Sequence, residues 1–196
     1  SALGPRYNGT RYDFEEDVPE AAGNSRRTLA GGSGEETNEA HTVYKEGMSE
    51  WCANCHTTFL TAHAGGAHQH WAGVPLGSTV AGRYNAYVSS SDISGGDQLT
   101  AYWGLVPFED ADVDLETVDT QNYTAGPEGA DRVMCLTCHR AHASAFADIA
   151  RWDMAETFIA DSRPDGSETG ATPEDVANKY YSYTFDPNQR SLCNKC

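Results

Sequence analysis

Six cysteines constrain this chain more than any other feature, because all of them fall into three pairs of identical spacing. The pairs are Cys52 and Cys55, Cys135 and Cys138, and Cys193 and Cys196. A histidine follows each of the first two pairs at once, as His56 and His139, so that each motif has the pattern Cys-x-x-Cys-His. The residue that would follow Cys196 lies beyond this sequence.

The pattern Cys-x-x-Cys-His is the attachment signature of a c-type haem. Two thiols one helical turn apart can each add to a vinyl group of one porphyrin, while the next imidazole lies under the iron. We therefore expect three covalently bound haems c on the six cysteines, with His56 and His139 as proximal iron ligands. Attachment of this kind is completed on the export side of the membrane, which predicts an extracellular or cell-surface location.

Paired cysteines of this spacing also occur in zinc ribbons, disulfide frameworks and thioredoxin-like redox sites. A zinc ribbon gives no reason for a histidine in the fifth position, and its two halves usually lie closer in sequence than Cys55 and Cys135. A disulfide within a Cys-x-x-Cys loop would link nothing distant in the chain. The three alternatives stay open, but haem attachment accounts for the pattern best.

Three haems with two axial imidazoles each need six histidines, and the chain contains seven. The expected distal ligands are His41, His63, His70 and His142, with His68 the histidine most readily left to solvent. Because His142 stands three residues after His139, both project from one helical turn, and His142 can reach the iron of a neighbouring haem. Two imidazoles on each iron leave no open position for a substrate, which favours electron transfer over catalysis.

Composition agrees with a fold built around cofactors. Only 39% of residues are apolar, mean hydropathy is -0.58, and the 196 residues include 19 glycines and 8 prolines. This small supply of apolar side chains favours a mainly coil protein with a few short α-helices and little β, in which stacked haems form the core.

The net charge of -16 opposes nucleic acid and anionic membranes as partners. No apolar run approaches the roughly 18 residues of a membrane span, so we expect a soluble, processed chain.

Composition also divides the chain into two parts. Residues 1–40 are polar, acidic and rich in glycine, which predicts an extended arm. Residues 41–196 hold every cysteine and histidine and form the expected multihaem cytochrome domain. Within it we expect helix over residues 41–64, irregular chain over 71–108, and a second helix through 143–152.

Six runs within residues 41–196 are specific in combination. They are Trp51-Cys-Ala-Asn-Cys-His56, Tyr84-Asn-Ala-Tyr87, Leu105-Val-Pro-Phe-Glu109, Val133-Met-Cys-Leu-Thr-Cys-His-Arg-Ala-His-Ala-Ser144, Arg151-Trp-Asp153 and Gln189-Arg-Ser-Leu-Cys-Asn-Lys-Cys196. Together they resemble the extracellular multihaem c-type cytochromes that polymerise into conductive filaments, most closely the tetrahaem OmcE type. This chain departs from that type in having three thiol pairs instead of four.

The resemblance implies bis-histidine haems stacked along a filament of identical subunits joined head to tail. It implies that one axial histidine comes from the adjacent subunit, and that electrons pass from a redox donor to an extracellular acceptor. It also implies that His70 and His142 are distal ligands.

The sequence therefore favours a non-enzymatic electron conduit, with two alternatives. A soluble periplasmic electron shuttle would ligate all of its irons internally. A multihaem oxyanion reductase would need one iron with an open side and cationic residues to hold the anion. The candidates for that role are Arg26, Arg83 and Arg132, and a chain of charge -16 repels anions.

Overall fold

The computed structural model describes residues 6–7, 12–13, 18–23, 37–56, 60, 71–141, 144, 146–162 and 185–189. The helices are α1 (Met48–Ala53), α2 (Gly77–Ala86) and α3 (Cys135–Cys138), with 3₁₀ turns η1 (Gln98–Thr100) and η2 (Ala147–Ile149). The strands are β1 (Arg6–Tyr7), β2 (Tyr12–Asp13), β3 (Ala21–Ala22), β4 (Val43–Lys45), β5 (Phe108–Asp110) and β6 (Arg132–Val133). The prediction of a mainly coil fold with short helices and little β is confirmed.

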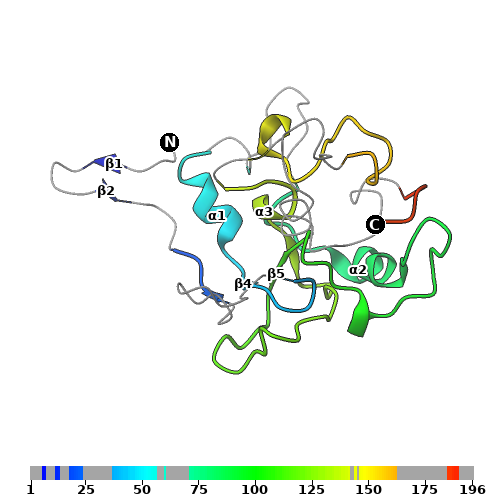
Figure 1. The fold of residues 1–196 in the computed structure, drawn as a ribbon. Helices are drawn as coiled ribbons and strands as arrows, with labels where there is room; N and C mark the ends of the chain where they lie inside the picture. Colours follow the sequence, from blue (N-terminus) through cyan, green and yellow to red (C-terminus); the bar gives the residue numbers. More distant parts are fainter. Residues whose placement is uncertain are drawn as a thin grey trace, which may run out of the picture.

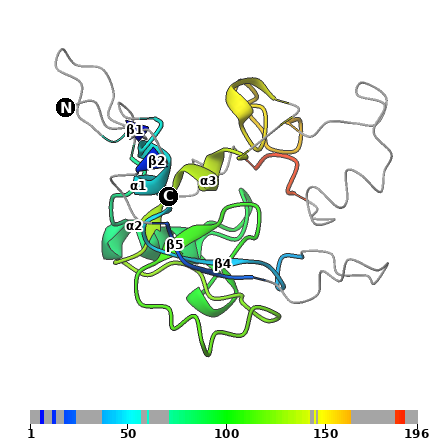
Figure 2. The same ribbon diagram turned by 90° about the vertical axis from the view of Figure 1, so that its left-hand side faces the viewer.

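A small four-stranded sheet organises the chain, with the strand order β3-β4-β5-β6. Strands β4 and β5 are parallel, with Tyr44 opposite Glu109, and run side by side in Figure 2. Strand β6 is antiparallel to β5 and places Arg132 opposite Glu109. Strand β3 pairs with β4, so Ala21 and Ala22 of the predicted arm join the sheet. The boundary between residues 1–40 and 41–196 stays a prediction.

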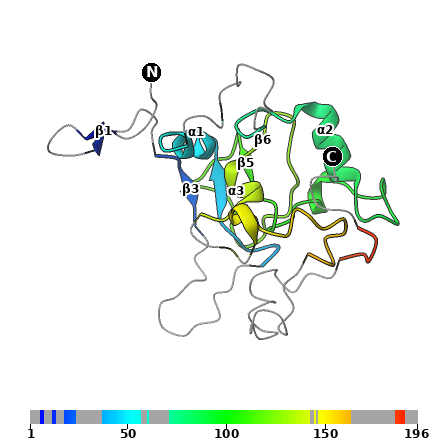
Figure 3. The ribbon, with the colours of Figure 1, turned by 90° about the horizontal axis from the view of Figure 1, so that it is seen from above.

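The sheet sets the position of both Cys-x-x-Cys-His motifs, because each motif follows a strand almost directly. Two residues separate β4 from α1, the second of them the left-handed Gly47 (φ 113°), and one residue, Met134, separates β6 from α3. Since β4 and β6 flank the same strand, α1 and α3 are brought against each other, as Figures 1 and 3 show.

An apolar core lies on the face of β5 that points away from α1. Successive side chains of a strand point to opposite faces, so Phe108 and Glu109 face different ways. Phe108 packs edge-on against Tyr84 of α2, with ring centroids 5.0 Å apart, while Glu109 contacts Ser49 of α1. The buried cluster comprises Tyr84, Trp103, Leu105, Val106, Phe108, Trp152, Ile159 and Phe185. Aromatic side chains supply much of this core, as expected where aliphatic residues are few.

Three sequence expectations about local structure are wrong. Residues 147–152 form no α-helix, only the 3₁₀ turn η2: Asp148 and Ile149 are left-handed (φ 55° and 56°), and the Ile149 carbonyl accepts a hydrogen bond from the Arg140 amide at 2.8 Å. Over residues 41–56, strand β4 precedes the short helix α1. Irregular chain was expected over 71–108, yet that segment contains α2.

The sequence does not predict helix α2, because its helical pattern of apolar residues is weak. It contains two glycines, and only Ala81 and Tyr84 of its ten residues are buried. Tertiary contact of Tyr84 with the core stabilises it more than intrinsic propensity does. No helix among the described residues combines the length and the apolar character needed to cross a bilayer.

Two glycine substitutions near α2 are predicted to have opposite effects. A Cβ at Gly82 meets nothing within 4 Å, and Gly82→Ala inside the helix should stabilise the fold by about 1 kcal/mol. A Cβ at Gly96 would lie 2.5 Å from the Asn85 carbonyl oxygen, and Gly96→Ala should destabilise it by about 1–3 kcal/mol. Chemical denaturation measures both free energies of unfolding. Equal effects of the two variants would contradict the packing of the 86–96 segment on α2.

Candidate functional site

The first Cys-x-x-Cys-His motif is a continuous helical turn. Helix α1 carries Cys52, and the turn continues beyond it, because the His56 amide donates to the Cys52 carbonyl at 2.9 Å. The buried Asn54 fixes this end by donating from its side chain to the Trp51 carbonyl. Cys55 and His56 are exposed and Cys52 is half-buried.

The second motif has the same local conformation. The His139 amide donates to the Cys135 carbonyl at 3.0 Å, which places the histidine one turn after the first cysteine of α3. The buried Thr137 hydroxyl accepts from the Met134 amide at 3.0 Å and donates to the Pro107 carbonyl at 2.5 Å. This hydroxyl both caps α3 and ties it to the segment before β5.

The two motifs meet at their first cysteines. The Cys52 thiol donates a hydrogen bond to Cys135, which raises the pKa of Cys52 and lowers that of Cys135. The Ser49 hydroxyl also hydrogen-bonds Cys135. Two groups attached covalently at Cys52 and Cys135 would therefore begin from adjacent sulfur atoms.

The imidazole of His139 is oriented by a backbone carbonyl. Its Nδ1 lies 2.8 Å from the Asp148 carbonyl oxygen, which the left-handed turn at Asp148 and Ile149 directs toward it. An Nδ1–H donated to this carbonyl leaves Nε2 as the nitrogen with a lone pair, as metal-bound histidines commonly require. The sequence analysis did not anticipate this partner, because it expected helix at this position.

His41 is buried at the edge of a cavity. Its ring stacks on Tyr102, with centroids 4.3 Å apart and planes 8° from parallel. Nδ1 lies 2.9 Å from the Thr42 carbonyl oxygen and Nε2 lies 3.1 Å from that of Tyr123. A neutral imidazole has one N–H and can donate to only one of these carbonyls. Donation from Nδ1 to Thr42 would leave the lone pair of Nε2 facing the Tyr123 carbonyl, which would have to move aside for an iron to bind there.

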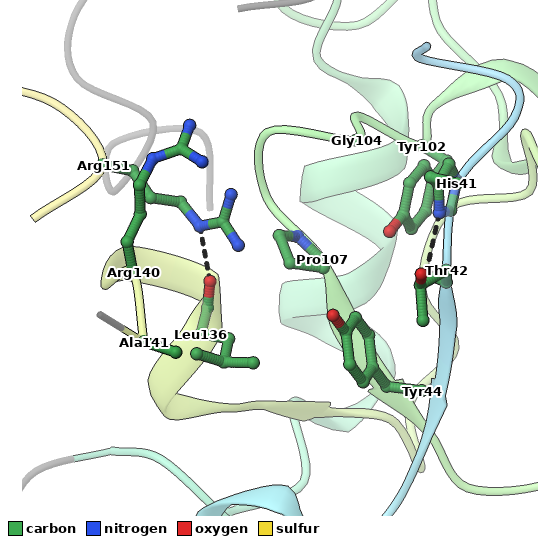
Figure 4. Close-up of a pocket in the computed structure, with 10 residues that line it drawn as sticks. All are labelled: His41, Thr42, Tyr44, Tyr102, Gly104, Pro107, Leu136, Arg140, Ala141 and Arg151. Atoms are coloured by element: carbon green, nitrogen blue, oxygen red, sulfur yellow. Dashed lines mark hydrogen bonds between the residues drawn. The ribbon is translucent and has the colours of Figure 1, made fainter. Parts of the chain in front are cut away.

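The cavity lies directly against α3 and has a volume of about 210 Å³. Figure 4 shows Arg140 and Arg151 on one side and the stacked His41 and Tyr102 on the other. The Arg151 Nε donates to the carbonyl of Leu136, the residue that follows Cys135, at 2.5 Å. Aromatic rings, two arginines and a buried imidazole beside α3 are residue types that suit a porphyrin and its carboxylates, although a cavity of about 210 Å³ holds only part of such a group.

The remaining predicted ligands lie outside the described residues. They are His63, His70, His142, Cys193 and Cys196, together with His68. Of the predicted set, the structure brings Cys52 and Cys135 into contact and places His41 in a cavity lined by a residue of the second motif. The roles of all these residues as ligands stay predictions.

Sequence reasoning missed Glu109 and Ser49, which lie where the motifs meet. Glu109 is completely buried, and its Oε1 accepts hydrogen bonds from the amide (2.9 Å) and the hydroxyl (3.2 Å) of Ser49. Burial raises the pKa of this carboxyl above its ordinary value. The one sequence feature that could have indicated a buried acid is that Glu109 directly follows the apolar run Leu105–Phe108.

Comparison with known proteins adds to this geometry. The chain is 36% identical to the C-type cytochrome OmcS of Geobacter sulfurreducens in an alignment of 214 positions, gaps included, that covers 98% of this chain. This chain is a relative of OmcS. Its fold is similar to that of the Outer Membrane Cytochrome S filament of the same organism, with a TM-score of 0.71 and 34% identity over 98% of the chain. A structure of OmcS nanowires gives a TM-score of 0.69 and 32% identity over the whole chain.

The similarity has two limits. This chain spans about half the length of these relatives, 48% of the OmcS sequence and 52% and 53% of the two filament chains. No protein-family model matches it. The resemblance to filament-forming multihaem cytochromes is supported at the level of OmcS, while the finer likeness to the OmcE type stays a prediction.

The Thr137 cap gives a test of how firmly the second motif is held. Thr137→Val keeps the shape of the side chain but leaves the buried Met134 amide and Pro107 carbonyl without this partner, which should cost about 2–3 kcal/mol. The control is Thr117→Val, whose hydroxyl is exposed and donates to Asp114, with an expected change below about 0.5 kcal/mol. Free energies of unfolding from chemical denaturation distinguish them, and equal losses would contradict the assigned role of Thr137.

Proposed function

We propose that this chain is a multihaem c-type cytochrome that conducts electrons along closely spaced bis-histidine haems. The observation that carries the proposal is the contact of Cys52 with Cys135, the first cysteines of two Cys-x-x-Cys-His motifs. Porphyrins attached at adjacent sulfurs are close enough for electrons to pass between them. The relationship to OmcS supports the same function.

In this proposal each cysteine pair holds one haem c, giving three for the chain. His56 and His139 are the proximal iron ligands, and the distal ligands come from His41, His63, His70 and His142. A bound haem supplies an iron that changes between the ferric and ferrous states. The chain's own residues fix the spacing of the haems through α1 and α3, and they orient the His139 imidazole through the Asp148 carbonyl.

The proposed role is that of an electron carrier, not of an enzyme. Two of the three arginines considered for a reductase lie apart: Arg132 contacts the carboxylates of Glu46 and Glu50 at 3.0 and 3.5 Å, and Arg83 is exposed on α2. Arg26 lies outside the described residues. A periplasmic shuttle remains the alternative if every iron is ligated within the chain.

We further propose that the protein acts outside the cell as part of a filament subunit. Its partners would be identical subunits joined head to tail, a redox donor and an extracellular acceptor. Structures of filaments and nanowires of the related OmcS support this assembly. A contact that repeats head to tail without closing generates a helical filament. Three thiol pairs leave the likeness to the four-haem OmcE type as a prediction.

Mass spectrometry of the intact polypeptide tests haem attachment. The mature protein should carry the added mass of three haems, and the Cys135→Ala/Cys138→Ala variant should carry one fewer, because its second site lacks both thiols. A Cys-x-x-Cys pair that is oxidised or binds zinc would add no tetrapyrrole mass. A polypeptide without any such mass would refute the proposed function.

The predicted distal role of His41 has a separate test. His41→Ala should convert one haem from low-spin to high-spin, as measured by electron paramagnetic resonance of the ferric protein, because one iron loses its second imidazole. His68→Ala is the matched control, since His68 is not among the expected ligands, and it should leave every haem low-spin. A fully low-spin spectrum of the His41→Ala protein would show that His41 only packs on Tyr102.

A further inference from the structure

Glu109 is a buried acid with an incomplete set of hydrogen bonds. Its side chain is on the face of β5 that looks toward α1, and the residue has an exposed fraction of 0%. Oε1 receives both donors of Ser49, and the Gly47 amide also interacts with the carboxylate, whereas Oε2 has no hydrogen-bond partner of its own among the described residues. A buried carboxylate oxygen without a donor disfavours the ionised form, and a protonated Oε2 would remove that cost.

The charges around Glu109 also favour protonation. On α1, the carboxylate of Glu50 is close enough to raise the pKa of Glu109. On β6, Arg132 is the register partner of Glu109, but its guanidinium contacts Glu46 and Glu50, so its positive charge is already matched. The other titratable neighbours are Tyr44 on β4, Cys52 on α1 and Cys135 on α3. The two cysteines become uncharged thioethers once haem is attached.

Glu109 lies beside the point where the two haems would attach. The Ser49 amide and hydroxyl donate to the Glu109 carboxylate, and the same hydroxyl oxygen hydrogen-bonds Cys135, so one side chain separates the acid from the second attachment site. Cys52 contacts Cys135 from the other motif, and Glu109 acts electrostatically on both cysteines. These cysteines bond to porphyrin carbons and do not ligate iron. A charge on Glu109 would therefore act on both irons through the half-buried region around Cys52 and Cys135.

We propose that Glu109 is a redox-linked proton site that couples the charge of the first two haems to proton uptake. This inference rests on the proposed function. When one electron from a neighbouring haem reduces a ferric iron of this pair to the ferrous state, the Glu109 carboxylate takes one proton from solvent and becomes a neutral carboxylic acid. Oxidation of the iron returns the electron to the next haem and the proton to solvent.

The sign of the pH dependence follows from this coupling. A ferric iron carries one more positive charge than a ferrous iron, so the pKa of Glu109 is lower while the iron is ferric. Coupling between two sites is reciprocal, so protonated Glu109 makes the iron easier to reduce. The midpoint potential should fall as pH rises from the pKa of Glu109 beside a ferric iron to its pKa beside a ferrous iron. For one proton and one electron the fall is at most 59 mV per pH unit, which is a tenfold change in the redox equilibrium constant.

The test is a spectroelectrochemical titration of the haem-loaded protein at a series of pH values. Glu109→Gln keeps an oxygen that can accept from Ser49 but cannot titrate, and it should remove the pH-dependent component from the haem pair. Glu116→Gln, an exposed acid on the 110–119 loop, makes the same change of charge and should leave the component intact. Infrared difference spectra should show a protonated carboxyl band on reduction, absent from Glu109→Gln.

A second variant keeps the test independent of how well Glu109→Gln folds. Glu50→Gln removes a like charge that raises the pKa of Glu109, so the sloping interval of potential against pH should move to lower pH. The inference is overturned if Glu109→Gln and Glu116→Gln have the same pH dependence, or if Glu50→Gln leaves the interval unmoved. If either of these results is found in a protein that carries its full haem mass, only the proton site is refuted. If the protein carries no haem, the proposed function is refuted as well.

Discussion

The pairing of β4 and β6 with the central strand β5 is the constraint on which the rest of the structure depends. Each of these two flanking strands runs almost directly into a Cys-x-x-Cys-His turn, so two short stretches of backbone pairing fix the distance between α1 and α3. The result is a thiol contact between Cys52 and Cys135. In the proposed cytochrome the covalent attachment of haem would then add a second constraint, since each porphyrin is fixed to a sulfur that the sheet has already positioned.

The two faces of β5 have different roles. Phe108 packs on Tyr84 and anchors α2 in an aromatic core, while Glu109 starts α1 by accepting from Ser49. The apolar face therefore contributes to the stability of the fold. The polar face places a carboxyl group next to two attachment sites, whereas most other acidic side chains in the described part of the chain are exposed. A buried acid is costly in a structural role alone, and redox-linked protonation gives it a functional one.

The Cys-x-x-Cys-His turns were predictable from the sequence because their conformation is local: the amide of each histidine bonds to a carbonyl four residues earlier. The sheet was not predictable, because its strands have two or three residues and Tyr44 pairs with Glu109 across 65 positions of sequence. The helix expected over residues 143–152 is wrong because bonds to His139 and Arg140 hold Asp148 and Ile149 in left-handed conformations. Glu109 was missed because only tertiary structure shows that it is buried.

The central claim is that the haems on Cys52 and Cys135 lie against each other. Circular dichroism in the Soret band tests it, in a cycle of the parent protein, Cys52→Ala/Cys55→Ala, Cys135→Ala/Cys138→Ala and the combined variant. The cycle isolates the part of the circular dichroism signal that arises from the interaction of these two haems, because the contribution of a third haem cancels. Porphyrins in contact should give a bisignate exciton signal that neither single-site protein retains. If the parent spectrum equals the sum of the separate haem contributions, with no interaction signal, the two haems do not lie against each other.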